Sequence, residues 1–181
     1  MAEDRSLVLQ RQRRLKWRAL DWLEALLMML CGATLMGFCT SVVCDIVTRT
    51  IGAPWLWLQE VTSTFFIYGI FIGAAVATRR NDHLFLAAVG DSLTGWPRLA
   101  IETAIRLVVI AVGAFLTYYG YVNFLRGFSS FRMPSMTPIA SLYAIIPISG
   151  ALIALFAFEQ LINGWRNGFE SVLEDDREPP P

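Results

Sequence analysis

The sequence predicts an all-α membrane protein with four transmembrane helices. Three observations predict this fold class: the composition, the length of the uncharged segments, and their apolar character on every face. Of the 181 residues, 55% are hydrophobic and only 17% are charged, and the mean hydropathy is +0.50. A soluble domain is nearer half apolar and a quarter charged, so we expect the additional apolar surface to face lipid.

Four uncharged segments set the number of helices. They are 20, 18, 19 and 26 residues long and cover residues 25–44, 61–78, 107–125 and 133–158. About 20 helical residues cross a hydrocarbon core of roughly 30 Å, whereas the strands of a membrane barrel alternate apolar and polar residues over about ten positions. We therefore expect a transmembrane domain at 20–165 with helices over about 20–47, 57–79, 97–125 and 138–162.

The first apolar segment follows a basic stretch at residues 1–19, as the core of a cleavable signal peptide would. Its 20 residues exceed the length of a signal-peptide core, and no cleavage site with small residues closes it. We expect this helix to stay in the mature protein, with residues 1–19 as a basic N-terminal segment.

Lys and Arg are divided unequally between the two sides of the predicted membrane domain. Twelve of the 15 fall in the N-terminal segment, in the connection between helices two and three, and in the C-terminal tail; the remaining three are Arg49, Arg126 and Arg132. Positively charged loops favour the cytoplasmic side, so we expect both termini in the cytoplasm. The tail at 166–181 is acidic and ends in three prolines, a composition typical of disorder.

The connection between helices two and three predicts a short helix at the membrane surface. Residues 81–93 begin with an Asp that can cap a helix, and apolar residues then cover about half of each turn. This segment is too short to span, so we expect an interfacial helix, with Trp96 at headgroup depth and Pro97 in the first turn of helix three.

The chain carries no recognisable motif for catalysis or cofactor binding. Its formal net charge of zero excludes a nucleic-acid binder that works through a basic face. His83 is the only histidine, the three cysteines lack metal-ligand spacing, and there is no phosphate-binding loop or nucleophile turn. We therefore expect no enzyme activity, no cofactor and no metal.

Ionisable residues stand only near the ends of the predicted spans. Asp45 and Arg49 end the first, Glu60 begins the second and Glu159 ends the fourth. Ion-coupled transporters hold ionisable groups deep in the bilayer, so we expect this chain to support transport rather than to perform it. Two pairs have the i,i+4 spacing of helix-end ion pairs, Asp45–Arg49 and Glu102–Arg106.

Small residues at helical spacing indicate close helix packing. One stripe in helix two comprises Gly69, Gly73 and Ala77, and a second in helix four comprises Gly150 and Ala154. Pro147, just before the second stripe, should kink helix four. Such stripes fit packing within the chain and packing against a partner, and both alternatives stay open.

Four motifs follow one another along the chain. They are Arg49-Thr50-Ile51-Gly52, Trp57-Leu58-Gln59-Glu60, Gly73-Ala74-Ala75-Val76-Ala77 and Arg79-Arg80-Asn81-Asp82-His83. This order resembles the small, DctQ-like membrane subunit of tripartite ATP-independent periplasmic (TRAP) transporters, over about residues 20–165. The family often has Glu where this chain has Gln59, which leaves Glu60 as the sole acid at that position.

The resemblance implies a non-catalytic subunit of the bacterial inner membrane. Such transporters take up organic acids with a periplasmic binding protein, a large sodium-coupled subunit that moves like an elevator, and a small subunit that supports the large one. The small subunit of this kind uses no ATP and holds no substrate site. Two alternatives are a stand-alone small membrane transporter and a membrane-anchored electron-transfer subunit.

Eight residues are the candidates for a partner interface or a structural motif: Arg49, Trp57, Glu60, Gly69, Gly73, Ala77, Arg80 and His83. Arg49 and Glu60 flank one short outer turn, and we favour a pair between them. Trp57 is expected in the aromatic belt at the membrane surface.

The remaining candidates are assigned to contacts with lipid or with other subunits. The stripe of small residues in helix two is expected to face the large subunit. Arg80 and His83 are expected to fix the interfacial helix to headgroups or to that subunit. The outer loop with Arg126, Ser129, Ser130 and Arg132 is a candidate contact for the binding protein.

Overall fold

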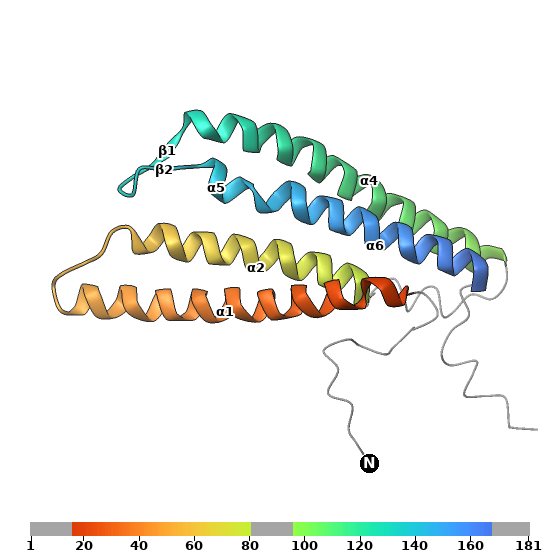
Figure 1. Ribbon diagram of the computed structural model, residues 1–181, viewed down its shortest axis with the longest axis horizontal. Helices are drawn as coiled ribbons and strands as arrows, with labels where there is room; N and C mark the ends of the chain where they lie inside the picture. Colours follow the sequence, from red (N-terminus) through yellow and green to blue (C-terminus); the bar gives the residue numbers. More distant parts are fainter. Residues whose placement is uncertain (1–15, 81–95, 168–181) are drawn as a thin grey trace, which may run out of the picture.

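The structure is a computed structural model that describes residues 16–80 and 96–167. Its long helices are α1 (Asp21–Thr50), α2 (Leu58–Arg80), α4 (Trp96–Arg126) and α6 (Ile145–Asn167), as Figure 1 shows. The predicted interfacial helix, His83, the first 15 residues and the tail from residue 168 lie outside the described residues.

Short elements connect the long helices. They are the 3-10 helices η2 (Arg18–Leu20) and η3 (Gly127–Ser129), the single helical turn α5 (Ala140–Tyr143), and the strands β1 (Phe131–Arg132) and β2 (Thr137–Pro138). The two strands form an antiparallel hairpin that pairs Phe131 with Pro138 and Arg132 with Thr137. This hairpin lies between α4 and α5, at the same end of the molecule as the α1–α2 turn (Figure 1).

Among residues 16–80 and 96–167, four helical segments are long and apolar enough to cross a membrane, which confirms the predicted all-α architecture with four spans. They cover Arg18–Thr50, Leu58–Arg80, Leu99–Ser129 and Ala140–Arg166. The 30 residues of α1 and the 31 of α4 correspond to about 45 Å of helix at 1.5 Å per residue. Both helices are longer than the hydrocarbon core, so they must tilt or extend beyond it.

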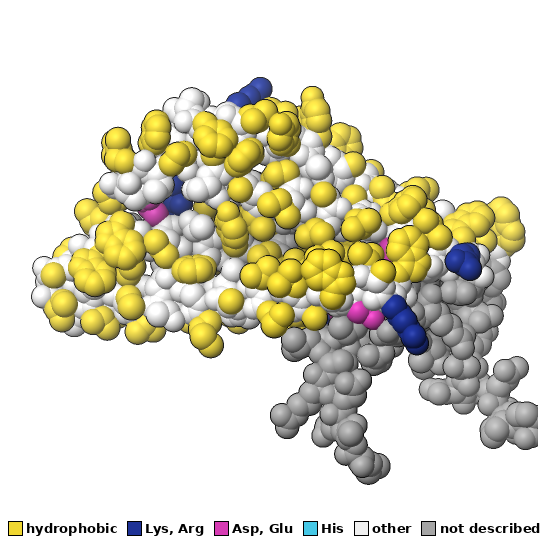
Figure 2. All heavy atoms as spheres, viewed as in Figure 1, with side chains coloured by type: hydrophobic (Ala, Val, Ile, Leu, Met, Phe, Trp, Pro, Cys, Tyr) yellow, Lys and Arg dark blue, Asp and Glu magenta, His cyan; other side chains and the backbone are white. Residues whose placement is uncertain are grey.

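The long helices pack in a row. α1 packs on α2, α2 on α6 and α6 on α4, which leaves α1 and α4 at opposite edges (Figure 1). The buried apolar core is therefore thin: Leu27, Ile72, Ala75, Val76, Ile145, Ile153 and Phe156. Large apolar side chains cover most of the outer surface instead, as Figure 2 shows for one face. Such a surface is suited to lipid or to another apolar protein surface.

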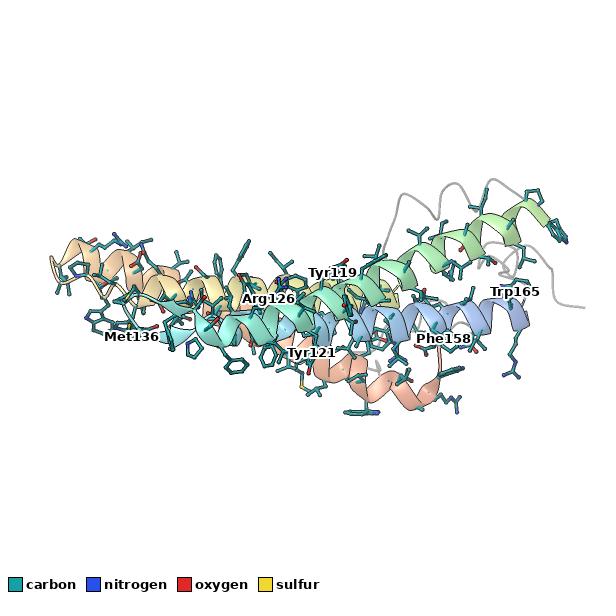
Figure 3. All side chains as sticks on the ribbon, turned by 90° about the horizontal axis from the view of Figure 1, so that it is seen from above. Tyr119, Tyr121, Arg126, Met136, Phe158 and Trp165 are labelled. Carbon is teal, nitrogen blue, oxygen red and sulfur yellow. The ribbon has the colours of Figure 1, made fainter. Side chains whose placement is uncertain are left out.

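Glycines allow α4 and α6 to cross with their backbones in contact (Figure 3). A Cβ atom on Gly150 would lie 2.7 Å from the backbone nitrogen of Thr117, and one on Gly113 would lie 2.8 Å from that of Ala154. The stripe of small residues in helix four therefore packs against α4. Packing within the chain was one of the two alternatives that the sequence left open.

The fourth span is interrupted at Ala144, between α5 and α6. Pro147 has no backbone N–H, so it cannot donate to the carbonyl of Tyr143 four residues earlier. Ala144 itself keeps helical dihedral angles, so α5 and α6 form one span, and the kink at Pro147 stays a prediction.

The six tryptophans lie near the two ends of the row. Trp17, Trp22, Trp96 and Trp165 lie at the start of α1, the start of α4 and the end of α6, and Trp55 and Trp57 lie in the α1–α2 turn. We call the first end the terminal end and the second the hairpin end, because β1 and β2 lie there. Trp concentrates at membrane–water interfaces, so both ends have the composition of the headgroup level.

Candidate functional site

Charged side chains gather inside the terminal end, where three helices meet. The cluster comprises Lys16, Asp21, Glu24, Arg79, Arg80 and Glu159. Among these six described residues, three are cationic and three are anionic. The side chains of Glu24, Arg79 and Glu159 are fully buried. Burial of charges on this scale requires that they be paired and hydrogen-bonded.

Arg79, in the last turn of α2, is the centre of the cluster. Its Nη2 atom lies 2.9 Å from Oδ1 of Asp21 and 3.7 Å from Oε1 of Glu159, and its Nε atom lies 3.2 Å from Oε2 of Glu24. One guanidinium thus contacts carboxylates from both α1 and α6. Because these helices flank α2 in the row, Arg79 joins three helices at one point.

Arg79 also holds the chain that leads into α1. Its guanidinium donates to the carbonyl of Leu20, and Nη2 donates to the carbonyl of Trp17 at 3.1 Å. The ring of Phe156 in α6 lies 5.3 Å from Cζ, within the range of a cation–π contact. The guanidinium is therefore surrounded by acceptors and by one aromatic face.

Two further cationic side chains contact Glu24. Its Oε1 atom lies 3.2 Å from Nε of Arg80, and its Oε2 atom lies 3.6 Å from Nζ of Lys16. Burial lowers the pKa of the Lys16 ammonium, and the neighbouring Glu24 carboxylate acts in the opposite direction. The carboxylate of Glu24 thus balances positive charge from residues 16–20, which we call the N-terminal approach, and from α2.

α6 binds the N-terminal approach through Glu159 and Asn163. The backbone N–H of Trp17 donates to Oε1 of Glu159, and the indole N–H of Trp17 donates to Oδ1 of Asn163 at 2.8 Å. These two acceptors are four residues apart, on one face of α6. The segment before α1 is therefore attached to the C-terminal part of α6.

Gln160 caps the end of α2. Its Nε2 atom donates to the carbonyl of Thr78 at 2.7 Å and to that of Arg79 at 3.1 Å. The last four carbonyls of a helix have no partner within the helix, so a donor from α6 satisfies two of them here.

A second polar group lies at the hairpin end, between α2 and the hairpin. Glu60 accepts hydrogen bonds from the hydroxyl of Ser135 and from its backbone N–H, the latter at 3.2 Å. Arg132 donates from Nη1 to Oγ1 of Thr64 and from Nη2 to the backbone carbonyl of Glu60, both at 2.9 Å. The hairpin is thereby fastened to the first two turns of α2.

A cleft of about 380 Å³ surrounds this polar group. One wall consists of Trp57, just before α2, and of Glu60, Val61, Thr64 and Phe65 in α2; the other wall consists of Arg132, Ser135, Thr137 and Ser141. Figure 2 shows an acidic and a basic side chain side by side in a hollow near this end of the molecule. The cleft therefore combines apolar walls with one cation and one anion.

The sequence matches the family described as "Tripartite ATP-independent periplasmic transporters, DctQ component" over residues 38–167. The match covers more than half of the chain. The chain belongs to the DctQ family. The resemblance inferred from the motifs is confirmed, and the protein is a multi-pass membrane component of a transport system rather than a member of a catalytic family.

Two relatives of this DctQ protein carry transporter names. The sialic acid TRAP transporter small permease protein SiaQ of Vibrio cholerae is 24% identical over 126 residues, which are 65% of this chain and 72% of SiaQ. The sialic acid TRAP transporter permease protein SiaT of Haemophilus influenzae is 24% identical over 110 residues, which are 60% of this chain but only 17% of SiaT. A segment similar to the DctQ protein thus forms a small part of a much longer permease.

The predicted pair between Arg49 and Glu60 is wrong. In the DctQ protein, Nε of Arg49 lies 2.9 Å from Oδ2 of Asp45, its i,i+4 neighbour in α1. Glu60 faces the hairpin, where it contacts Ser135 and Arg132. Arg49 and Glu60 therefore have different partners, although they flank the same turn. Both i,i+4 pairs expected from the sequence, Asp45–Arg49 and Glu102–Arg106, are present.

The stripe of small residues in α2 faces α1. A Cβ atom on Gly69 would lie 3.3 Å from Oγ1 of Thr34, and one on Gly73 would lie 3.7 Å from Sγ of Cys31. Gly69 and Gly73 therefore take part in packing within the chain, and their contact with the large subunit stays a prediction. Ala77, one turn further on, is half-buried.

Arg80 and Trp57 are the remaining predicted candidates within the described residues. Arg80 lies in the ionic cluster beside Glu24, a partner that the sequence analysis did not foresee. Trp57 is exposed and stacks on Trp55, with ring centroids 5.8 Å apart. Sequence reasoning missed Arg79 and Glu24, although Asp21 and Glu24 stand one turn apart at the start of α1 and offered a signal.

Proposed function

We propose that this DctQ protein is a non-catalytic scaffold for the large, sodium-coupled elevator subunit of a TRAP-type transporter. Membership of the DctQ family is the observation that carries the proposal. The match to a short part of SiaT supports a partnership with a larger permease, since a similar segment belongs to one there. A flat row of helices with apolar side chains on its surface suits a contact with a second membrane protein.

The distribution of charge supports a passive role. The central segments of the four spans, at residues 25–44, 61–78, 107–125 and 140–158, contain no Asp, Glu, Lys or Arg. The charged groups of the ionic cluster are engaged with one another at the terminal end. Coupling ions and substrate would then be bound by the large subunit, because ion pathways in membranes are built from ionisable groups at depth.

The orientation proposed from the Lys and Arg bias places the terminal end in the cytoplasm. The hairpin end would then face the periplasm, where a substrate-binding protein is expected. Arg132 is engaged with α2, so the exposed Arg126, with Ser129 and Ser130, is the better candidate for that contact. Both relatives carry sialic acid in their names, which supports an organic acid as the transported solute.

Reconstitution tests this proposal. The DctQ protein, its large membrane partner and the binding protein are purified and placed together in proteoliposomes with an inward sodium gradient. We expect uptake of radiolabelled sialic acid, or of another organic acid from a panel, only when all three components are present. Omitting the DctQ protein should reduce both the uptake and the yield of the large subunit.

Two controls make the result decisive. Proteoliposomes with the DctQ protein alone should take up no solute, because the chain would hold no site for it. Uptake by the isolated chain would overturn the scaffold role. Undiminished uptake by the large subunit and the binding protein without the DctQ protein would overturn it equally.

A further inference from the structure

We propose that the cleft at the hairpin end binds the headgroup of a zwitterionic glycerophospholipid, with the phosphate on Arg132 and the amine toward Glu60. The inference depends on the membrane location of the chain and not on its role as a scaffold. It rests on the unused donors of Arg132, on the pairing of opposite charges, and on the shape and depth of the cleft.

Arg132 has donors without acceptors. A guanidinium carries five N–H bonds, and two of them donate, to Thr64 and to the backbone of Glu60. The other three have no hydrogen-bond acceptor among the residues that the structure describes, although only 15% of the Arg132 side chain is exposed. Arg132 lines the cleft, and phosphate oxygens there would be acceptors that a guanidinium binds through strong, charge-assisted hydrogen bonds.

The carboxylate of Glu60 decides which phosphate compound fits. Its Oε2 atom lies 3.9 Å from Nε of Arg132, which is too far for a hydrogen bond. A purely anionic ligand on Arg132 would meet this carboxylate and be repelled. When the ligand carries both a phosphate and an amine, its phosphate faces the guanidinium of Arg132 and its amine faces the carboxylate of Glu60. Such charge complementarity gives specificity.

The walls of the cleft accommodate the lipid below its headgroup. Val61 and Phe65 lie four residues apart on one face of α2, and with Trp57, just before the helix, they provide a mostly apolar surface. The volume of about 380 Å³ lies within the range of small-molecule sites, roughly 300–1,000 Å³.

The cleft also lies at the correct depth. It includes Trp57, which with Trp55 marks the headgroup level at the hairpin end. Figure 2 shows an acidic and a basic side chain in a hollow of the broad face of the row, and in a bilayer crossed by these helices that face is turned sideways. A phospholipid can therefore enter laterally, with its acyl chains remaining in the membrane.

Native mass spectrometry of the full chain from lipid nanodiscs tests the site. Discs are prepared with phosphatidylethanolamine or with phosphatidylglycerol, and a third sample in detergent receives inorganic phosphate only. We expect one phosphatidylethanolamine to remain bound to the wild-type chain. Arg132→Gln should weaken its retention about ten- to a hundredfold, as expected for the loss of charge-assisted hydrogen bonds.

Two further variants separate binding from folding. Val61→Trp fills the cleft but leaves the contacts of Arg132, Glu60 and Ser135 in place, so it should lose the lipid while the hairpin stays attached. Arg126→Gln removes an exposed cation at the same end and should retain the lipid. Helix content and elution volume, measured for each variant, establish that it is folded.

Three results would overturn the site. One is equal retention of phosphatidylethanolamine by the wild type and Val61→Trp. Another is preferential retention of phosphatidylglycerol or of inorganic phosphate, which would assign the cleft to anions. The third is the same loss in Arg126→Gln as in Arg132→Gln, which would show only a general effect of positive charge.

Discussion

Arg79 and Glu24 are both fully buried and lie with 3.2 Å between Nε and Oε2, although one ends α2 and the other begins α1. This pair lies in the fully buried part of the ionic cluster. Arg79 also reaches Glu159 of α6, so the terminal ends of three helices depend on one guanidinium. Each partner is stable in the interior only while the other is present, because an unpaired buried charge is far more costly than a paired one.

Arg79→Met should destabilise the protein strongly. The change leaves Asp21, Glu24 and Glu159 with Lys16 and Arg80 as the cations of the cluster. We expect a loss of about 3–5 kcal/mol, the range for breaking a buried ion pair from one side. Thermal unfolding in detergent measures it, with Arg126→Met as the exposed control.

A double-mutant cycle tests whether Arg79 interacts directly with Glu24. Arg79→Gln and Glu24→Gln together should cost less than the sum of the single changes, with a coupling of about 0.5–3 kcal/mol. Strictly additive losses, or an unfolding temperature of Arg79→Met equal to that of Arg126→Met, would contradict the assigned role of this pair.

Glu159→Gln and Glu159→Leu should differ at Trp17. Glutamine keeps a side-chain oxygen that accepts from the backbone N–H of Trp17, whereas leucine leaves that N–H without its acceptor. Loss of one partner of a buried hydrogen bond costs about 1–3 kcal/mol. Hydrogen exchange should therefore be faster at the Trp17 amide in Glu159→Leu than in Glu159→Gln. Equal exchange in the two variants would show that this contact does not hold the N-terminal approach.

Gly150→Ala should separate α4 from α6. The added Cβ would lie 2.7 Å from the backbone nitrogen of Thr117, and a backbone atom cannot move aside alone. Overpacking of this kind costs about 1–3 kcal/mol. Gly32→Ala in α1 is the matched control, because a Cβ there meets no atom within 4 Å. Thermal unfolding compares them, and a Gly150→Ala protein as stable as Gly32→Ala would refute the close crossing.

Exchanging the charges of Arg49 and Glu60 should not restore assembly with the large subunit. Arg49 pairs with Asp45, and Glu60 is bound by the hairpin, so Arg49→Glu with Glu60→Arg places each new charge beside the wrong partner. Arg49 is exposed, and surface pairs contribute about 0–1 kcal/mol, so Arg49→Glu alone should be mild. Glu60→Arg alone should be the more severe change. Recovery of assembly with the large subunit in the double variant, measured by co-purification, would revive the predicted pair.

The four spans could be predicted from the sequence because they depend on local properties. A run of about 20 apolar residues has the same preference for lipid whatever lies beside it. The DctQ resemblance is likewise carried by the order of motifs along the chain. The i,i+4 pair of Asp45 with Arg49 is as local, since one turn of a helix fixes both positions.

Contacts between helices were decided only by the tertiary structure. The sequence marks Gly69 and Gly73 as a stripe for close packing, but the rotation and order of the helices determine that α1 occupies it. The same holds for Arg79 with Glu24 and for Glu60 with Arg132, which belong to segments far apart in the chain. Composition sets where each segment lies in the bilayer, whereas partner choice depends on which helix ends meet, and hydropathy carries no information about that.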